Sequence, residues 1–199
     1  TTANGLLQST AKWLAKGPPR ATITQEGLAI LMEVLTFRTY PRRARKINDR
    51  LLGIAMAEDG ANALELFAYY QNQGYSVEES YRNMMRVCRG GLPAGGAPFT
   101  KDICYCQGFI ENYNFIRTAI RHGRPELIRF LFAGKLHVRD VPLIYQKYLE
   151  GIVEAPTYIP PPFTDLSGLA VWMSFSNYLN QVDLKTVQDD YDALFSKYL

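Results

Sequence analysis

The sequence contains few of the residues from which metal sites and disulfides are usually built. It has only two histidines, His122 and His137, and no H-E-x-x-H pattern, so no complete zinc site of that type can form from these 199 residues alone. The three cysteines are Cys88, Cys104 and Cys106, and the C-x-C pair lacks the C-x-x-C spacing of redox and zinc-knuckle sites. We therefore expect ordinary thiols in a reducing compartment, the cytoplasm.

Long apolar runs and a strong net charge are also missing. No stretch of 18 or more uncharged apolar residues occurs, which excludes a membrane-spanning helix of the usual length. The formal net charge of +3 is too small to indicate nucleic acid or an anionic membrane as a partner. A hydrophobic content of 47% with 13% aromatic residues excludes a disordered chain. The sequence thus indicates a globular protein that binds neither nucleic acid nor membrane.

Apolar residues recur with helical spacing along nearly the whole chain. Leu28, Leu31, Met32 and Leu35 predict a helix over residues 25–36, with Thr24 as its N-cap. Ser76 and Glu79 have the spacing of a capping box. No convincing alternation typical of strands is present, so we predict a mainly α fold. Further helices are predicted over residues 42–56, 62–73, 76–88, 101–121, 125–133 (with Gly134 as C-cap), 141–150, 167–179 and 184–198.

Two segments interrupt the helical pattern. Residues 89–99 (RGGLPAGGAPF) contain four glycines and two prolines, which is incompatible with a regular element. Residues 155–163 (APTYIPPPF) predict an extended linker, because each proline disfavours helical backbone in the residue before it. We therefore expect one helical domain over residues 1–162 and a helical extension, residues 163–199, packed on it.

Glu26 is the first carboxylate that could carry chemistry. In the first turn of a helix a glutamate complements the helix dipole and contributes at most about 1 kcal/mol. Gly27 argues against so simple a role, since glycine inside a helix costs roughly 1 kcal/mol relative to alanine. Such a glycine usually marks close approach by a backbone, a ligand or a neighbouring helix. Glu33 lies two turns further on the same face, so a functional and a structural role of Glu26 both stay open.

Basic residues gather in a run just after this predicted helix. A run of this kind is either a solvated helix face or a surface for an acidic partner. Only one aromatic residue, Tyr40, stands within it, too few to stack on successive bases, which disfavours nucleic acid. The run consists of Arg38, Arg42, Arg43, Arg45 and Lys46.

Charged and tyrosine side chains flank the glycine-rich segment. Arg86 and Arg89 precede it, and Lys101, Asp102 and Tyr105 follow it, without the Walker pattern of phosphate-binding loops. Two arginines and a lysine around such a turn are able to hold a carboxylate, and a tyrosine hydroxyl is able to donate to a developing oxyanion. The alternative is a structural helix–loop–helix corner with a surface contact between Lys101 and Asp102.

Several of these stretches, in order and spacing, resemble one family. They are residues 24–29 (TQEGLA), residues 86–91 (RVCRGG), residues 99–102 (FTKD) followed by Tyr105 and Gly108, and the pair Gly134-Lys135. The set resembles the QEGLA-motif family of zinc metallopeptidases, which includes bacterial flavohemoglobin-expression modulators and eukaryotic tubulin tyrosine carboxypeptidases. The resemblance covers residues 1–162, and the unbroken QEGLA string favours the bacterial branch.

The resemblance implies a gluzincin-like helical fold, a zinc cofactor and a peptide or protein C-terminus as substrate. In that family two histidines of an HExxxH helix and the glutamate of the QEGLA helix hold zinc, which makes Glu26 the expected third ligand. Glu33 is then a candidate to support the ligand from the same helix face. Arg86, Arg89 and Lys101 are expected to bind the substrate carboxylate, and Tyr105 to stabilise the tetrahedral intermediate.

The sequence departs from the family pattern because no HExxxH segment is present. In the family that segment precedes a stretch resembling residues 2–5 (TANG), so we expect this chain to begin just past it and to need the missing N-terminal half for activity. A second hypothesis is a non-catalytic helical interaction module, in which Glu26, Arg86 and Tyr105 are structural. Convergence of the candidate residues on one cleft favours the enzyme, and scattered positions favour the module.

Overall fold

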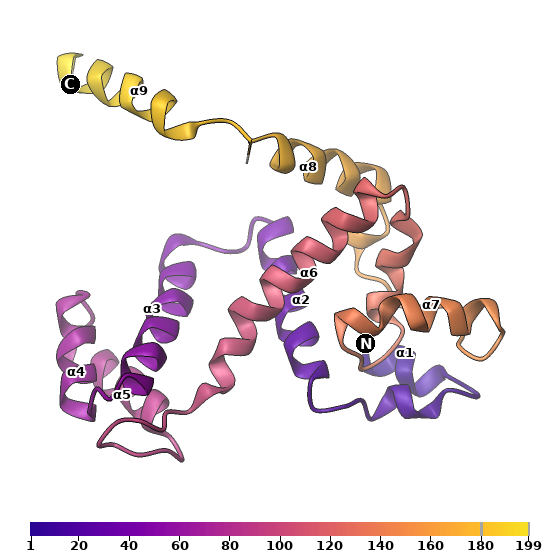
Figure 1. The fold of residues 1–199 in the computed structure, drawn as a ribbon, viewed down its shortest axis with the longest axis horizontal. Coiled ribbons are helices and arrows are strands. Elements are labelled where there is room, and N and C mark those ends of the chain that lie inside the picture. Colours follow the sequence, from indigo (N-terminus) through magenta and orange to yellow (C-terminus); the bar gives the residue numbers. More distant parts are fainter. Residues whose placement is uncertain (180, 199) are drawn as a thin grey trace. The chain divides into compact units, whose positions relative to one another are not determined.

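The computed structural model describes residues 1–179 and 181–198 (Figure 1). All regular elements in these residues are α- or 3₁₀-helices and none is a strand, which confirms the predicted mainly α fold. The chain forms two compact units. The central unit comprises Gly17–Asn112 and Lys135–Val138, and the terminal unit comprises Thr1–Lys16, Tyr113–Gly134 and Arg139–Leu199. The division at residues 162 and 163 stays a prediction.

The central unit is built from four complete helices and the first part of a fifth. Its core contains the buried residues Ile54, Leu66 and Met84. It lies where three helices pack together: α3 (Pro41–Glu58), α4 (Ala63–Asn72) and α5 (Val77–Cys88). Asn62 caps α4 in a full capping box with Glu65, and the Ser76 hydroxyl caps α5 by accepting from the Glu79 amide at 3.2 Å. The helices are α2 (Ala21–Leu35), α3 (Pro41–Glu58), α4 (Ala63–Asn72), α5 (Val77–Cys88) and α6 (Ile103–Arg121), the last preceded by a 3₁₀ turn at Thr100–Asp102.

Helix α2 begins four residues earlier than the sequence predicts. Thr24 is not its N-cap, because the residue lies within the helix. Its side chain is buried, and its hydroxyl accepts a hydrogen bond from the Val138 amide at 2.8 Å. The hydroxyl is therefore used by a distant segment rather than by the helix terminus. As a consequence Glu26 does not stand in the first turn, which contains no acidic residue. Glu26 therefore does not stabilise the helix by complementing its dipole in the first turn.

The glycine-rich segment is irregular, as predicted, but it is fastened to the helices around it. The Gly96 amide donates to the Ala57 carbonyl at 2.6 Å, and the Ala63 amide donates to the Pro93 carbonyl at 2.7 Å. The Phe99 amide donates to the Val87 carbonyl at 2.7 Å. These bonds join the segment to the ends of α3 and α5 and to the start of α4, so it has a defined conformation.

The terminal unit gathers the two ends of the chain and the second part of α6. The segment predicted as a helix over residues 125–133 is a 3₁₀-helix over Pro125–Phe132, and Gly134 does not cap it in a left-handed conformation. A Cβ at Gly134 would lie 2.6 Å from the Leu14 Cβ, so close packing explains this glycine. No described helix combines the length and apolar character needed to cross a bilayer. The remaining elements are α1 (Thr2–Leu7), α7 (Val141–Leu149), α8 (Leu166–Leu179), α9 (Leu184–Tyr198) and 3₁₀ turns at Lys12–Ala15, Val138–Asp140 and Pro161–Phe163.

Candidate functional site

Glu26 is positioned by a close crossing of α2 and α6 in the central unit. A Cβ at Gly27 would lie 2.0 Å from the Gly108 carbonyl carbon, and a Cβ at Gly108 would lie 1.9 Å from the Ile23 carbonyl oxygen. Only glycine permits helix backbones to approach this closely. The close approach predicted from Gly27 is thus confirmed, and the neighbour is a helix backbone.

This crossing gives Glu26 and Tyr105 a common environment. Tyr105 lies one turn before Gly108 on α6, and its pKa is raised by burial and then by the negative charges of Glu26 and Asp102. The same two carboxylates act on Cys104, whose pKa is raised to about 11, mainly by burial. Glu26 itself is half-buried. Asp102, Cys104 and Tyr105 thus form one polar cluster at the start of α6, and Glu26 of α2 acts on it electrostatically.

Arg86 joins the same cluster through an ion pair. Its Nη2 donates to Asp102 Oδ1 at 2.9 Å and its Nε donates to Oδ2, so the pair is bidentate. Asp102 is buried, whereas Arg86 is half-buried, and the hydrogen bond with Asp102 raises the pKa of Arg86. Asp102 therefore has Arg86 as its ion-pair partner where the sequence suggested Lys101.

The other two cations predicted to bind substrate lie nearer the solvent. Arg89 is exposed, and its guanidinium carbon lies 4.8 Å from the centre of the Phe99 ring in a cation–π contact. Lys101 is exposed as well, and its charge lowers the pKa of Cys104 against the larger effect of burial. Both side chains thus remain accessible to a dissolved ligand.

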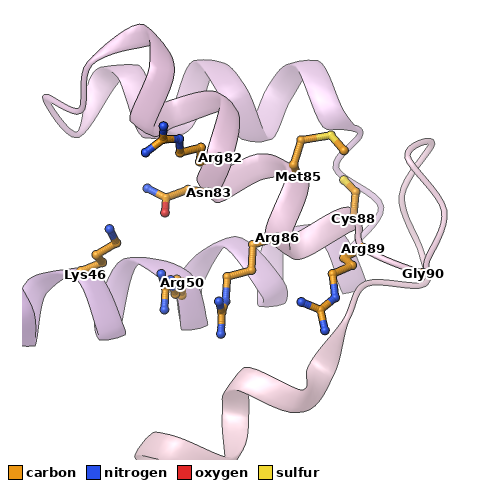
Figure 2. Close-up of a pocket in the computed structure, with 9 residues that line it drawn as sticks. All are labelled: Lys46, Arg50, Arg82, Asn83, Met85, Arg86, Cys88, Arg89 and Gly90. Carbon is orange, nitrogen blue, oxygen red and sulfur yellow. The ribbon is translucent and has the colours of Figure 1, made fainter.

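A pocket of about 570 Å³ lies between α3 and α5, and we call it the α3–α5 pocket (Figure 2). It brings together Arg86 and Arg89 of the predicted set, but Glu26, Lys101 and Tyr105 are not among its lining residues. Figure 2 shows the Arg50 and Arg86 guanidinium groups next to each other, and the charge of Arg86 indeed lowers the pKa of Arg50. The lining residues are Lys46, Arg50, Arg82, Asn83, Met85, Arg86, Cys88, Arg89 and Gly90.

Sequence reasoning missed Arg50, Arg82 and Asn83 as members of this pocket. The signal was helical spacing: Lys46 and Arg50 are four residues apart on α3, and Arg82 and Arg86 are four residues apart on α5. Each pair lies on one helix face. What the spacing cannot give is that the two faces border the same pocket, because that depends on how α3 packs against α5.

Much of the basic run on α3 is paired within the chain. Arg43 binds Glu33 through two nitrogens at 3.1 and 3.2 Å, and Arg42 binds Glu79 at 2.7 Å. The Glu33 carboxylate also accepts from the Thr39 hydroxyl at 3.3 Å, so Glu33 joins α2 to the start of α3. A second pocket, of about 390 Å³, adjoins this run and is lined by Tyr40, Arg42, Arg43, Lys46, Arg50 and Glu79.

The side chains around Glu26 include possible metal donors. No group of three or more His, Cys, Asp or Glu in the described residues is arranged to hold a metal ion. Cys104 interacts electrostatically with Glu26, and burial raises the pKa of its thiol to about 11. His137 contacts a carboxylate, with its Nε2 3.2 Å from Glu111 Oε2. The described residues therefore do not make a zinc site by themselves.

Comparison with known proteins identifies a family. No curated protein and no solved structure matches the chain significantly. The family model described as microtubule-associated tyrosine carboxypeptidase matches residues 1–181, which is most of the sequence and more than the motifs alone covered. The match agrees with the resemblance carried by the QEGLA, RVCRGG and FTKD stretches. The chain belongs to the microtubule-associated tyrosine carboxypeptidase family.

Proposed function

We propose that this chain is part of a zinc-dependent carboxypeptidase of the cytoplasm that acts on a peptide or protein C-terminus. Family membership supports the reaction class. The observation that supports the proposal is the Gly27–Gly108 crossing, since Glu26 stands beside Gly27, acts electrostatically on Tyr105 and has no role at a helix terminus. In this proposal Glu26 is one of three zinc ligands, and the two histidines come from an HExxxH segment that these 199 residues do not contain.

When bound, zinc supplies Lewis acidity and a water molecule of lowered pKa. The chain's own contribution in this proposal is to orient one carboxylate and one phenol. Because the pKa of Tyr105 is raised, its hydroxyl stays protonated at neutral pH and is able to donate a hydrogen bond to the oxyanion of a tetrahedral intermediate. Asp102 holds Arg86 in a fixed orientation through two hydrogen bonds.

The cations near this cluster suit a C-terminal carboxylate. Arginine binds carboxylate bidentately, and Arg86 and Arg89 line one pocket. Two nitrogens of Arg86 are already bonded to Asp102, so we assign the main contact with the substrate carboxylate to Arg89. Lys101, exposed at the 3₁₀ turn before α6, is a further candidate for that contact.

The proposal is tested by release of the C-terminal residue from a peptide, with this chain preceded by an HExxxH segment of the same family. Tyr105→Phe should lower kcat about 100-fold with little change in KM, the cost of one oxyanion donor. Arg89→Gln should raise KM about tenfold with kcat nearly unchanged, because the substrate carboxylate is bound equally in ground and transition states. Tyr81→Phe and Arg38→Gln, both at exposed positions, are the matched controls. If the Tyr105 and Arg89 variants behave like these controls, the roles assigned to the two residues are wrong. If the joined protein releases no residue at all, the interaction-module hypothesis replaces the enzyme.

A further inference from the structure

The α3–α5 pocket carries a surplus of positive charge that the proposed peptidase site does not explain. Five of its nine lining residues are cationic and none is acidic. Arg82 is paired with Glu78 and Arg86 with Asp102. Among the described residues the structure shows no ion pair for Lys46, Arg50 or Arg89. The pocket therefore holds about three cations without a salt bridge, and of these Arg50 still interacts electrostatically with Asp102 and Lys46 with Glu79.

Two hydrogen-bond donors at this pocket are also buried without an acceptor. Asn83 is 3% exposed and its Nδ2 has no partner, and the Nε of Arg50 is in the same situation. A buried donor without an acceptor costs about 1–3 kcal/mol. Burial and then the neighbouring charge of Arg86 lower the pKa of Arg50, whereas the charge of Asp102 raises it. An anion in the pocket that is rich in acceptors would accept hydrogen bonds from Asn83 and Arg50. It would also balance the positive charges of Arg50 and Arg86.

Charge and size distinguish between the anions that could bind. A single carboxylate brings one negative charge and leaves about two positive charges unbalanced, whereas one phosphate group brings about 1.5 to 2. The volume of about 570 Å³ has room for more than one phosphate group. No aromatic ring lines the pocket, so nothing there would stack on a base. The second pocket shares Lys46 and Arg50 and extends the row of cations along α3.

We propose that the α3–α5 pocket binds an oligophosphate, a ligand with two or more linked phosphate groups. Lys46, Arg50 and Arg89 would balance its charge, and the Asn83 amide would donate to a phosphate oxygen. The proposal does not rest on the peptidase function. Because Arg86 and Arg89 line the pocket, an oligophosphate would compete with a substrate carboxylate where that function exists, and it would act as an inhibitor.

The experiment is isothermal titration of tripolyphosphate into the 199-residue chain in metal-free buffer of low salt. We expect one site per chain, and affinity that falls as salt rises, because charge dominates the contact. Lys46→Gln and Arg50→Gln should each weaken binding about tenfold, the loss expected for one charge-assisted hydrogen bond. Arg38→Gln, an exposed cation outside both pockets, should change affinity less than about twofold.

Asn83→Leu separates binding from folding. Replacing the unpartnered amide with an apolar group of similar shape should leave the midpoint of thermal unfolding unchanged or raised, while binding of tripolyphosphate weakens. Lys46 is half-buried and lies on α3 away from the core cluster, so its variant is expected to fold even if the Arg50 variant does not.

Titrations with ATP and with penta-glutamate distinguish between the possible sources of the negative charge. Equal affinity for ATP and tripolyphosphate would assign recognition to the phosphate chain alone, and clearly tighter binding of ATP would make a nucleotide the source; both results support the proposal. The proposal is overturned if neither tripolyphosphate nor ATP binds at millimolar concentration. It is also overturned if binding is the same in Lys46→Gln, Arg50→Gln and the wild-type chain. Tighter binding of penta-glutamate than of tripolyphosphate would also overturn it and would make the pocket a site for acidic peptide.

Discussion

Asn4 illustrates how a single side chain holds the terminal unit together. Its Nδ2 donates to the Phe132 and Tyr158 carbonyls at 2.7 and 2.8 Å. Its Oδ1 accepts from the Thr157 and Tyr158 amides at 3.1 and 2.9 Å. The side chain is buried, its bond to the Phe132 carbonyl is buried as well, and the other three bonds are partly buried. An amide is required here, because only an amide offers two donors and an acceptor in this shape.

Asn4→Asp therefore should destabilise the chain by about 3 kcal/mol, since the carboxylate loses two donors and faces two carbonyl oxygens. Chemical denaturation followed by circular dichroism measures the effect. Asn48→Asp, at an exposed position of α3, serves as the control and should change stability by less than about 0.5 kcal/mol. An Asn4 variant as stable as this control would show that the four bonds contribute little.

Tyr75 links stability to alkaline pH. Its hydroxyl donates to Asp49 Oδ2 at 2.9 Å, and burial together with this bond raises the pKa of Tyr75 to about 12 from an ordinary value of 10.0. The folded state thus holds the proton more tightly than the unfolded state. Its contribution to stability is complete below pH 10 and is lost as the pH rises from 10 through about 12.

Tyr75→Phe should consequently flatten the fall in unfolding free energy between pH 10 and 12. The variant also removes a bond to the buried Asp49, so it should be less stable at neutral pH. Urea denaturation at several pH values measures both effects. An equally steep fall in the variant would mean that Tyr75 does not titrate in this range.

At the scale of elements, the crossing of α2 and α6 is the feature on which the candidate site depends. Gly27 and Gly108 permit backbone contact, and Glu26 and Tyr105 stand next to that contact. Sequence reasoning identified Gly27 as a point of close approach because a helix-interior glycine needs a reason. It could not identify Gly108 as the partner from physical argument, since nothing local pairs two glycines 81 positions apart.

Gly27→Ala should destabilise the chain by about 2 kcal/mol, because a Cβ would lie 2.0 Å from the Gly108 carbonyl carbon. At an open helical position the same substitution would add about 1 kcal/mol of stability. The sign of the change is therefore diagnostic. Thermal or chemical unfolding that shows a more stable Gly27 variant would contradict the close crossing.

Helix positions were largely predictable, and the exceptions have physical reasons. Helices α4 and α5 begin within one residue of their predicted starts, and the predicted cap Ser76 is confirmed; the cap of α4, Asn62, was not predicted. The start of α2 was misplaced because the Thr24 hydroxyl bonds to the Val138 amide, a contact between segments far apart in the sequence. The same limit applies to the α3–α5 pocket: cation spacing along each helix was visible, but the packing that joins the two rows was not.

For the molecule as a whole, we propose a zinc site to which this chain contributes one ligand. Glu26 has no set of His, Cys, Asp or Glu around it in the described residues that would complete the site. Zinc titrated into the chain alone should therefore show no tight stoichiometric binding. Tight binding of one zinc that Glu26→Gln abolishes would mean that this chain completes the site without an HExxxH segment.

The most direct test measures bound zinc and release of the C-terminal residue for this chain preceded by an HExxxH segment of the same family, beside its Glu26→Gln variant. We predict one zinc per chain and peptidase activity in the wild type, with both lost in the variant because an amide is a much weaker zinc ligand than a carboxylate. Equal zinc content and activity in the two proteins, or a wild type without zinc, would contradict this prediction.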